Sequence, residues 1–182
     1  MSHALVIGGT GMLSNVSLWL VSQGYHVSVI GRNLQRMESL LGRSTDKHAI
    51  TPVFVDYSDD NQLKEELKST IEKNGPCELV VAWVHSYAES AIETISQEVS
   101  IQNGEWRLFH VLGSNKDINE IKRKINIPES CKYRQIQLGF ILENDHSRWL
   151  TNEEISQGVI DSIQNERLIH TVGTIEPWEK RP

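Results

Sequence analysis

Short apolar runs rich in β-branched residues recur along the chain, and several of them are continuous rather than alternating with polar positions. Continuous runs are typical of parallel strands that are covered on both faces of a sheet. The pattern therefore predicts strands at residues 4–7, 26–30, 50–55, 78–84, 107–112, 133–142 and 168–173.

The segments between these runs carry apolar residues three or four positions apart, which is the spacing of one face of a helix. Such stripes lie at residues 13–21, 34–41, 63–71, 88–95, 118–125 and 155–163. Thr151 and Glu154 have the spacing of a capping box, and Ser114 stands where it would cap the helix that follows. Strands alternating with helices predict an α/β fold with a doubly wound, mostly parallel Rossmann sheet of about seven strands.

The composition is that of a globular domain, and we expect residues 1–182 to form a single one. The formal net charge of −6 argues against nucleic acid or an anionic membrane as a partner. No apolar stretch approaches the roughly 18 residues that span a bilayer, and we expect no signal peptide. Two cysteines far apart in the sequence suit a reducing cytoplasm, and the histidines show no metal-ligand spacing. We therefore expect a cytoplasmic protein that binds no metal.

The first apolar run ends in a cluster of glycines, in the segment ALVIGGTGMLSN. A strand, a glycine loop and a helix in that order are typical of a nucleotide site, where a pyrophosphate meets the helix N-terminus. Gly8 would allow the tight turn, and Gly11 would let the phosphate approach the backbone. Ser14 takes the place of a third glycine that lets helix and strand pack closely. The alternative is a purely structural turn.

The end of the second predicted strand bears on the choice of nucleotide. An NAD site usually has an acidic residue about 20 positions after the glycines, which binds the ribose 2′-hydroxyl. The segment VSVIGRN has Arg32 there instead, and a guanidinium group pairs well with a 2′-phosphate. We therefore favour NADP over NAD, with a solvated surface arginine as the alternative.

Together these segments resemble the short-chain dehydrogenase/reductase superfamily, in particular its atypical members. GGTGMLS resembles the glycine loop, and GRN resembles the form that prefers NADP. VDYSD resembles the adenine-contacting pair, VAWVHS the strand that lies against the cofactor ribose, LGS the position of the catalytic serine, and QLGFI the segment that holds the nicotinamide. The resemblance implies a set of cofactor-binding residues: Gly8, Gly9, Thr10, Gly11, Met12, Leu13, Arg32, Asp56, Tyr57, Val84, Gly139, Phe140 and Ile141.

The chain departs from the superfamily in its catalytic pair, a tyrosine followed four residues later by a lysine. The helix predicted after Ser114 contains no tyrosine. Tyr133 comes next, but it is followed by Gln137 and lies in a predicted strand. Ser114 and His85 remain as the candidate catalytic residues, because each follows a strand at the edge that would face the cofactor. Ser114 is also read as a helix cap, and His85 as an ordinary loop histidine.

The leading interpretation is an atypical short-chain oxidoreductase that uses NADP(H) to reduce or oxidise a small carbonyl or alcohol. The absent tyrosine–lysine pair keeps a second interpretation open, a non-catalytic protein that binds NADP(H) and reports redox state to a partner. A third is a scaffold without cofactor. The substrate is not indicated by the sequence, and a homo-oligomer is the usual expectation for such folds.

Overall fold

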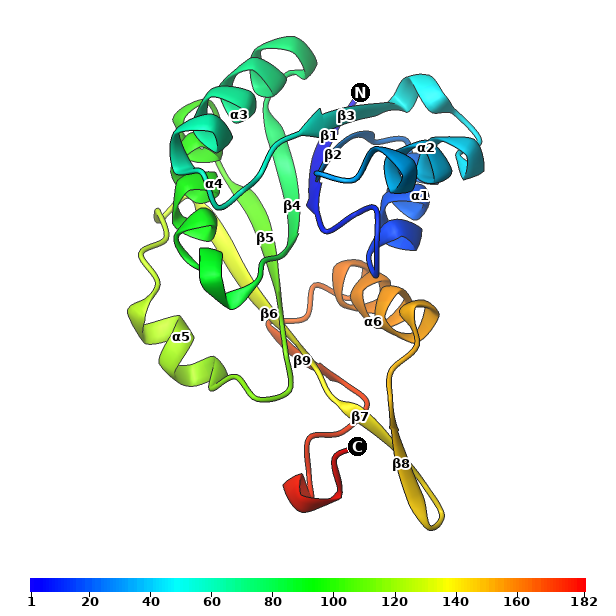
Figure 1. The fold of residues 1–182 in the computed structure, drawn as a ribbon. Coiled ribbons are helices and arrows are strands. Elements are labelled where there is room, and N and C mark those ends of the chain that lie inside the picture. Colours follow the sequence, from blue (N-terminus) through cyan, green and yellow to red (C-terminus); the bar gives the residue numbers. More distant parts are fainter.

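The computed structural model describes all 182 residues, and its centre is a parallel sheet of seven strands (Figure 1). Every neighbouring pair of strands in this sheet is parallel. In spatial order the strands are β3 (Ile50–Phe54), β2 (His26–Gly31), β1 (His3–Ile7), β4 (Cys77–Trp83), β5 (Trp106–Leu112), β6 (Cys131–Leu138) and β9 (Ile169–Val172). The predicted fold class, a doubly wound Rossmann sheet, is thereby confirmed.

Helices cover both faces of the sheet. One face is covered by α1 (Ser14–Ser22), α2 (Leu34–Arg43) and α6 (Asn152–Gln164), and the other by α3 (Asp60–Asn74), α4 (Ser90–Ile101) and α5 (Ile118–Lys124). Successive strand residues point to opposite faces, so Val6 joins the core under α1 and α6 while Leu5 joins the core under α3 and α4. The short α5 buries none of its residues, and Figure 1 shows it set apart from α3 and α4. None of the helices has the length and apolar character needed to cross a membrane.

The winding of the chain reverses at the centre of the sheet. β1 pairs with β2 on one side and with β4 on the other, so the crossovers run in opposite directions from this point. In open α/β sheets, ligands bind at such a point, outside the carboxyl ends of the strands. The glycine loop after β1 and the segment after β4 both lie there.

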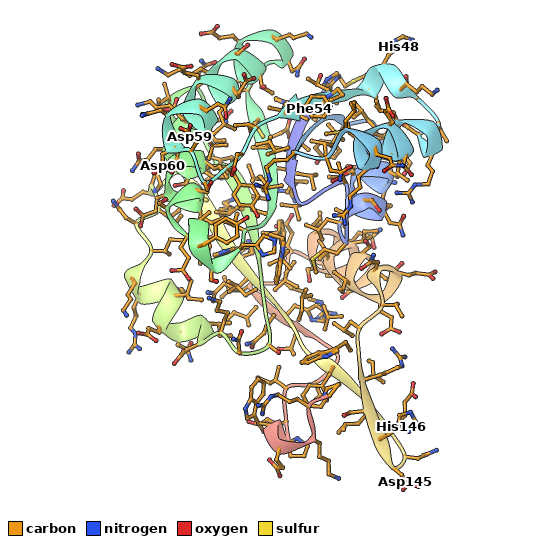
Figure 2. All side chains as sticks on the ribbon, in the orientation of Figure 1. His48, Phe54, Asp59, Asp60, Asp145 and His146 are labelled. Carbon is orange, nitrogen blue, oxygen red and sulfur yellow. The ribbon has the colours of Figure 1, made fainter.

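The expected strand at residues 133–142 is wrong, because the chain leaves the sheet at Gly139. β6 ends at Leu138, and β7 (Phe140–Glu143) pairs with β8 (His146–Trp149) in an antiparallel hairpin. An added Cβ on Gly139 would lie 2.2 Å from the backbone oxygen of Thr174, so only glycine permits this crossing of two chain segments. Figure 2 shows Asp145 and His146 at the tip of the hairpin, away from the sheet.

The expected start of the last helix is confirmed. Thr151 caps α6, and its side chain accepts a hydrogen bond from the backbone N–H of Glu154 at 3.1 Å. The helix α6 packs against α1 on the same face of the sheet. Ser156 of α6 contacts Met12 in the glycine loop, so this loop is supported by a helix that is more than 140 residues distant in sequence.

Candidate functional site

The glycine loop joins β1 to α1 at the centre of the sheet. Gly8 has a φ of +86°, a left-handed conformation that residues with a side chain rarely adopt. An added Cβ on Gly9 would lie 2.6 Å from Ser17 Oγ and 2.9 Å from two valine side chains. An added Cβ on Gly11, in contrast, would meet no atom closer than 3.9 Å. The fold therefore requires the first two glycines, whereas the third leaves the outer face of the loop open.

The close contact of helix and strand falls on Gly9 and Ser17, and not on Ser14 as the sequence predicts. Ser17 is fully buried and its Oγ donates to the Gly9 carbonyl at 3.3 Å, whereas Ser14 is only partly buried. Leu13 is also fully buried, and the Thr10 side chain lies against the end of β2. A small polar residue within the apolar stripe of α1 was the signal for this close approach.

The N-terminus of α1 offers free hydrogen-bond donors beside the open face of the loop. No side chain caps α1, and its first turn carries no acidic residue. The backbone N–H groups of Met12, Asn15 and Val16 donate to no atom of the protein. Ser156 Oγ of α6 donates to the Met12 carbonyl at 2.9 Å and holds the loop from the opposite side. Free N–H groups at the positive end of a helix dipole are suited to a phosphate or another anion.

Two guanidinium groups lie beside this loop. Arg32 follows β2, and its Nη1 is 3.1 Å from Asp56 Oδ2 at the end of β3, with 61% of the arginine side chain exposed. Arg36 comes from the first turn of α2, and its Nη1 is 3.9 Å from the position of a Cβ on Gly11. Arg36 forms no ion pair and is not among the residues that the sequence motif indicates. The sequence signal that could have identified Arg36 is its position in the first turn of the helix capped by Asn33, four residues after Arg32.

The residues after β3 and β4 meet beside Arg32. Hydrogen bonds from Ser58 and then the Arg32 guanidinium lower the pKa of Asp56, so this carboxylate is ionised at neutral pH. The Tyr57 hydroxyl accepts a hydrogen bond from the backbone N–H of His85 at 3.4 Å, and burial raises the pKa of this phenol. Tyr57 and Val84 are half-buried against the core under α3 and α4. The structure thus brings together the predicted adenine-side and ribose-side residues.

His85 lies at the exposed start of the segment after β4. Its ring stacks on Tyr87, with ring centres 5.4 Å apart and planes 12° from parallel, and meets the edge of Trp83 at 6.3 Å. Neither ring nitrogen of His85 makes a hydrogen bond, so no partner fixes its tautomer. His85 is therefore placed by aromatic contacts alone.

Ser114 lies in the loop between β5 and α5. Its hydroxyl makes no hydrogen bond, and Gln137 holds the loop by donating from Nε2 to the Lys116 carbonyl at 2.8 Å. The prediction that Ser114 caps the helix is wrong. Asp117 caps α5, because it directly precedes the first helical residue and accepts hydrogen bonds from the N–H groups of Asn119 and Glu120.

Gly139, Phe140 and Ile141 lie where β6 gives way to the hairpin. The N–H of Gly139 donates to the Val172 carbonyl at 2.9 Å, and the N–H of Phe140 donates to the Thr174 carbonyl at 2.8 Å. The Phe140 side chain is fully buried and Ile141 is partly buried. The backbone donors of the first two residues are thus already used within the protein.

The sequence places Tyr133 in a strand rather than a helix, and the structure confirms this, because Tyr133 lies in β6. Its hydroxyl is 2.7 Å from His110 Nδ1, inside the layer between β5 and α5. Gln137, at the position four residues later, serves the loop contact described above. No three histidine, cysteine, aspartate or glutamate side chains converge as metal ligands would.

No protein-family model matches the chain, and no curated protein matches its sequence. Many solved structures match its fold. A short-chain dehydrogenase/reductase from Serratia marcescens has a TM-score of 0.71 at 15% identity, with 95% of this chain and 96% of that chain covered. A short-chain dehydrogenase/reductase from Brucella melitensis, glucose/ribitol dehydrogenase, has a TM-score of 0.69 at 9% identity, with 95% and 94% covered.

A variant of actinorhodin polyketide ketoreductase, in a structure with NADPH, has a TM-score of 0.70 at 12% identity, with 96% of each chain covered. Such low identity shows the fold and leaves the chemistry to be argued from the residues of this chain. The chain therefore has the Rossmann fold that short-chain dehydrogenases and reductases share.

Proposed function

We propose that the protein is an atypical short-chain oxidoreductase that uses NADP(H) on a small carbonyl or alcohol substrate. One observation carries the proposal: free N–H groups at the start of α1 lie beside the guanidinium groups of Arg32 and Arg36. This arrangement suits a ligand with a pyrophosphate and a further phosphate nearby. The nicotinamide, when bound, supplies or accepts a hydride.

The residues present fit such a cofactor. Gly11 and the N–H groups of Met12 and Asn15 would hold the pyrophosphate, while Arg32 would hold the 2′-phosphate. Asp56 keeps Arg32 in place through its ion pair at 3.1 Å, and Tyr57 closes the adenine side. Cytoplasmic location, a homo-oligomeric state and the preference for NADP over NAD stay predictions.

Replacing Arg32 tests the nucleotide preference. We expect NADPH to bind about ten- to a hundredfold more tightly than NADH, because the contacts of the 2′-phosphate contribute roughly 1.5–3 kcal/mol. Arg32→Ala should erase this difference without weakening NADH. Tryptophan fluorescence titrations with each nucleotide provide the measurement. Arg123→Ala, which removes a guanidinium from α5 far from the glycine loop, is the matched control and should change neither affinity. Equal binding of the two nucleotides by the unaltered protein would contradict the NADP assignment.

A non-catalytic NADP(H) sensor is the second candidate, and one observation favours it. The helix after Ser114 has only seven residues, and the next tyrosine in the sequence, Tyr133, directs its hydroxyl at His110. The superfamily's proton donor is therefore absent from its usual element. A sensor would bind oxidised and reduced cofactor with different affinity and turn over neither.

Turnover separates the two candidates. We expect NADPH to be consumed in the presence of a small ketone, and the rate to fall at least tenfold in Ser114→Ala if this residue is catalytic. His85→Ala tests the other candidate catalytic residue by the same fall in rate. NADPH absorbance at saturating cofactor gives the rate, and Ser22→Ala, on the far end of α1, serves as the control. No measurable turnover together with tight NADPH binding would favour the sensor.

A further inference from the structure

A cavity of ≈ 590 Å³ opens between α4 and α5, at the carboxyl ends of β4 and β5. Its volume lies within the range of small-molecule sites. The apolar part of its wall consists of Val84, Ile92, Leu112, Ile121 and Ile125. No residue of the glycine loop lines it, and neither Ser114 nor His85 does so. The cavity therefore lies at the same edge of the sheet as the proposed cofactor site and shares only Val84 with it.

A buried histidine faces this cavity with one nitrogen unpartnered. His110 of β5 lines the cavity and has only 7% of its surface exposed. Its Nδ1 is 2.7 Å from the Tyr133 hydroxyl, whereas its Nε2 makes no hydrogen bond within the protein. His110 Nε2 is not among the fully enclosed polar atoms that lack a partner, so it is open to a group that enters the cavity.

The neighbours of His110 indicate which ring nitrogen carries the proton. Gln135 Nε2 lies 2.8 Å from the Ile118 carbonyl, which only accepts, so the amide nitrogen and not its oxygen faces that side. The same nitrogen is 3.3 Å from the Tyr133 oxygen, which accepts from it. The tyrosine O–H is then free to donate to His110 Nδ1. On this network we assign the proton of the neutral ring to Nε2, on the side away from Tyr133.

His110 stays neutral under ordinary conditions. Burial, and to a lesser extent the nearby Lys116 ammonium, lowers the pKa of His110 to about 4. Nε2 is therefore a hydrogen-bond donor without a full charge, the kind of group that binds a carbonyl oxygen.

The charges around the cavity restrict what it accepts. Four carboxylates and two ammonium groups line it, namely Glu89, Glu93, Asp117, Glu120, Lys116 and Lys124. Both lysines are paired, Lys116 with Glu89 at 3.2 Å and Lys124 with Glu120. The formal balance of −2 disfavours an anionic ligand.

We propose that this cavity binds the carbonyl group of an uncharged or cationic small molecule, whose oxygen accepts a hydrogen bond from His110 Nε2. The assignment rests on the proposed function in one respect, that a carbonyl is the group a reduced nicotinamide converts. His110 binds and orients this oxygen. It transfers no proton in the proposal, because its Nδ1 already accepts from Tyr133.

Four probes that share one aromatic ring test the assignment: acetophenone, its 4-trimethylammonium derivative, 4-acetylbenzoate and ethylbenzene. The full chain, labelled with ¹⁵N in its histidines, is titrated at pH 7.5 with and without NADPH, and the His110 Nε2 resonance is followed. We expect saturable shifts with acetophenone and the cationic ketone. 4-Acetylbenzoate should bind at least tenfold more weakly, and ethylbenzene, which lacks the oxygen, should leave Nε2 unshifted.

Variants of the donor and of the wall provide the matched comparisons. His110→Leu should weaken acetophenone about tenfold, whereas His110→Gln, which keeps an acceptor for Tyr133 and a donor toward the cavity, should stay within about threefold. Ile121→Trp places a large side chain in the cavity wall formed by α5 and should abolish binding. Ile101→Trp, at an exposed position on α4 outside the cavity, should not.

A further variant tests whether the negative charge of the cavity wall weakens the binding of anions. Glu93→Gln retains an oxygen for the N–H of Asn126, which Glu93 Oε1 accepts at 3.0 Å, and removes one negative charge from the wall. We expect it to strengthen binding of 4-acetylbenzoate severalfold. Glu72→Gln, an exposed position on α3 away from the cavity, is its control.

The outcomes separate this inference from the proposed function. Ketone binding at His110 without any nucleotide binding would overturn the oxidoreductase proposal and leave the carbonyl site standing. Nucleotide binding with no ketone-dependent shift of His110, with or without NADPH, would overturn the carbonyl site alone. Equal ketone affinity in His110→Leu, His110→Gln and the unaltered protein would overturn it as well.

Discussion

Gly9→Ala is expected to lower the free energy of unfolding by about 3 kcal/mol, the upper part of the range for overpacked interiors. The added methyl group would lie 2.6 Å from Ser17 Oγ and 2.9 Å from side-chain carbons of Val6 and Val29. These neighbours belong to α1, β1 and β2, all of them buried. Because three elements crowd the position, none of them moves away without disturbing the others.

The measurement is urea unfolding of the full chain, followed by tryptophan fluorescence. Gly42→Ala is the matched control, because Gly42 lies inside α2 and an added Cβ there meets no atom within 4 Å. This substitution should raise the free energy of unfolding by about 0.5–1 kcal/mol, since alanine favours the helix over glycine. The same change of residue is thus expected to act with opposite sign at two positions.

A second substitution locates the strain. Gly9→Ala combined with Ser17→Ala removes the nearest of the three contacts, so the double variant should lose less than the sum of the two single losses. Additive losses would show that Ser17 is not the main obstacle. A Gly9→Ala protein as stable as the unaltered one would contradict the packing of the loop between α1 and the sheet.

The order of strands and helices could be predicted because local periodicity determined it. Most of the parallel strands are apolar runs, and each helix that packs on the sheet shows its own apolar stripe. The hairpin β7–β8 was missed because its cause is distant in sequence. The backbone at Gly139 lies against the backbone at Thr174, and no pattern within residues 133–142 predicts that contact. The cap of α5 was misplaced by three residues because Ser114 and Asp117 are both good capping residues.

The residues of the candidate site also fall into those that a local motif reveals and those that only contacts between distant segments reveal. Motifs that are contiguous in sequence, such as the glycine loop and Arg32, could be found without the structure. Arg36 and Gln137 could not, because their roles depend on which loop lies next to them in space. His110 lies within the strand predicted at residues 107–112, and it is buried in β5. Only the structure shows that it lines a cavity between α4 and the seven-residue α5.

Acidification is expected to destabilise the protein through His110. Its pKa is about 4 in the folded protein, because burial disfavours the charged ring, whereas an unfolded histidine has a pKa of about 6.5. Between these values the unfolded chain binds a proton that the folded protein does not. The free energy of unfolding therefore falls as the pH is lowered, by about 2 kcal/mol from pH 7.5 to pH 5 and by about 3 kcal/mol at pH 4.

Comparison with His110→Gln isolates this contribution. Burial also lowers the pKa values of His3, His26 and His170, so they weaken the folded state in the same direction, but they do so in both proteins. Urea unfolding at pH 5, 6 and 7.5 gives the free energies. The variant should lose about 2 kcal/mol less than the unaltered protein between pH 7.5 and pH 5. Parallel pH profiles would show that His110 has the same pKa in the folded and unfolded protein, and would contradict the lowering of its pKa by burial.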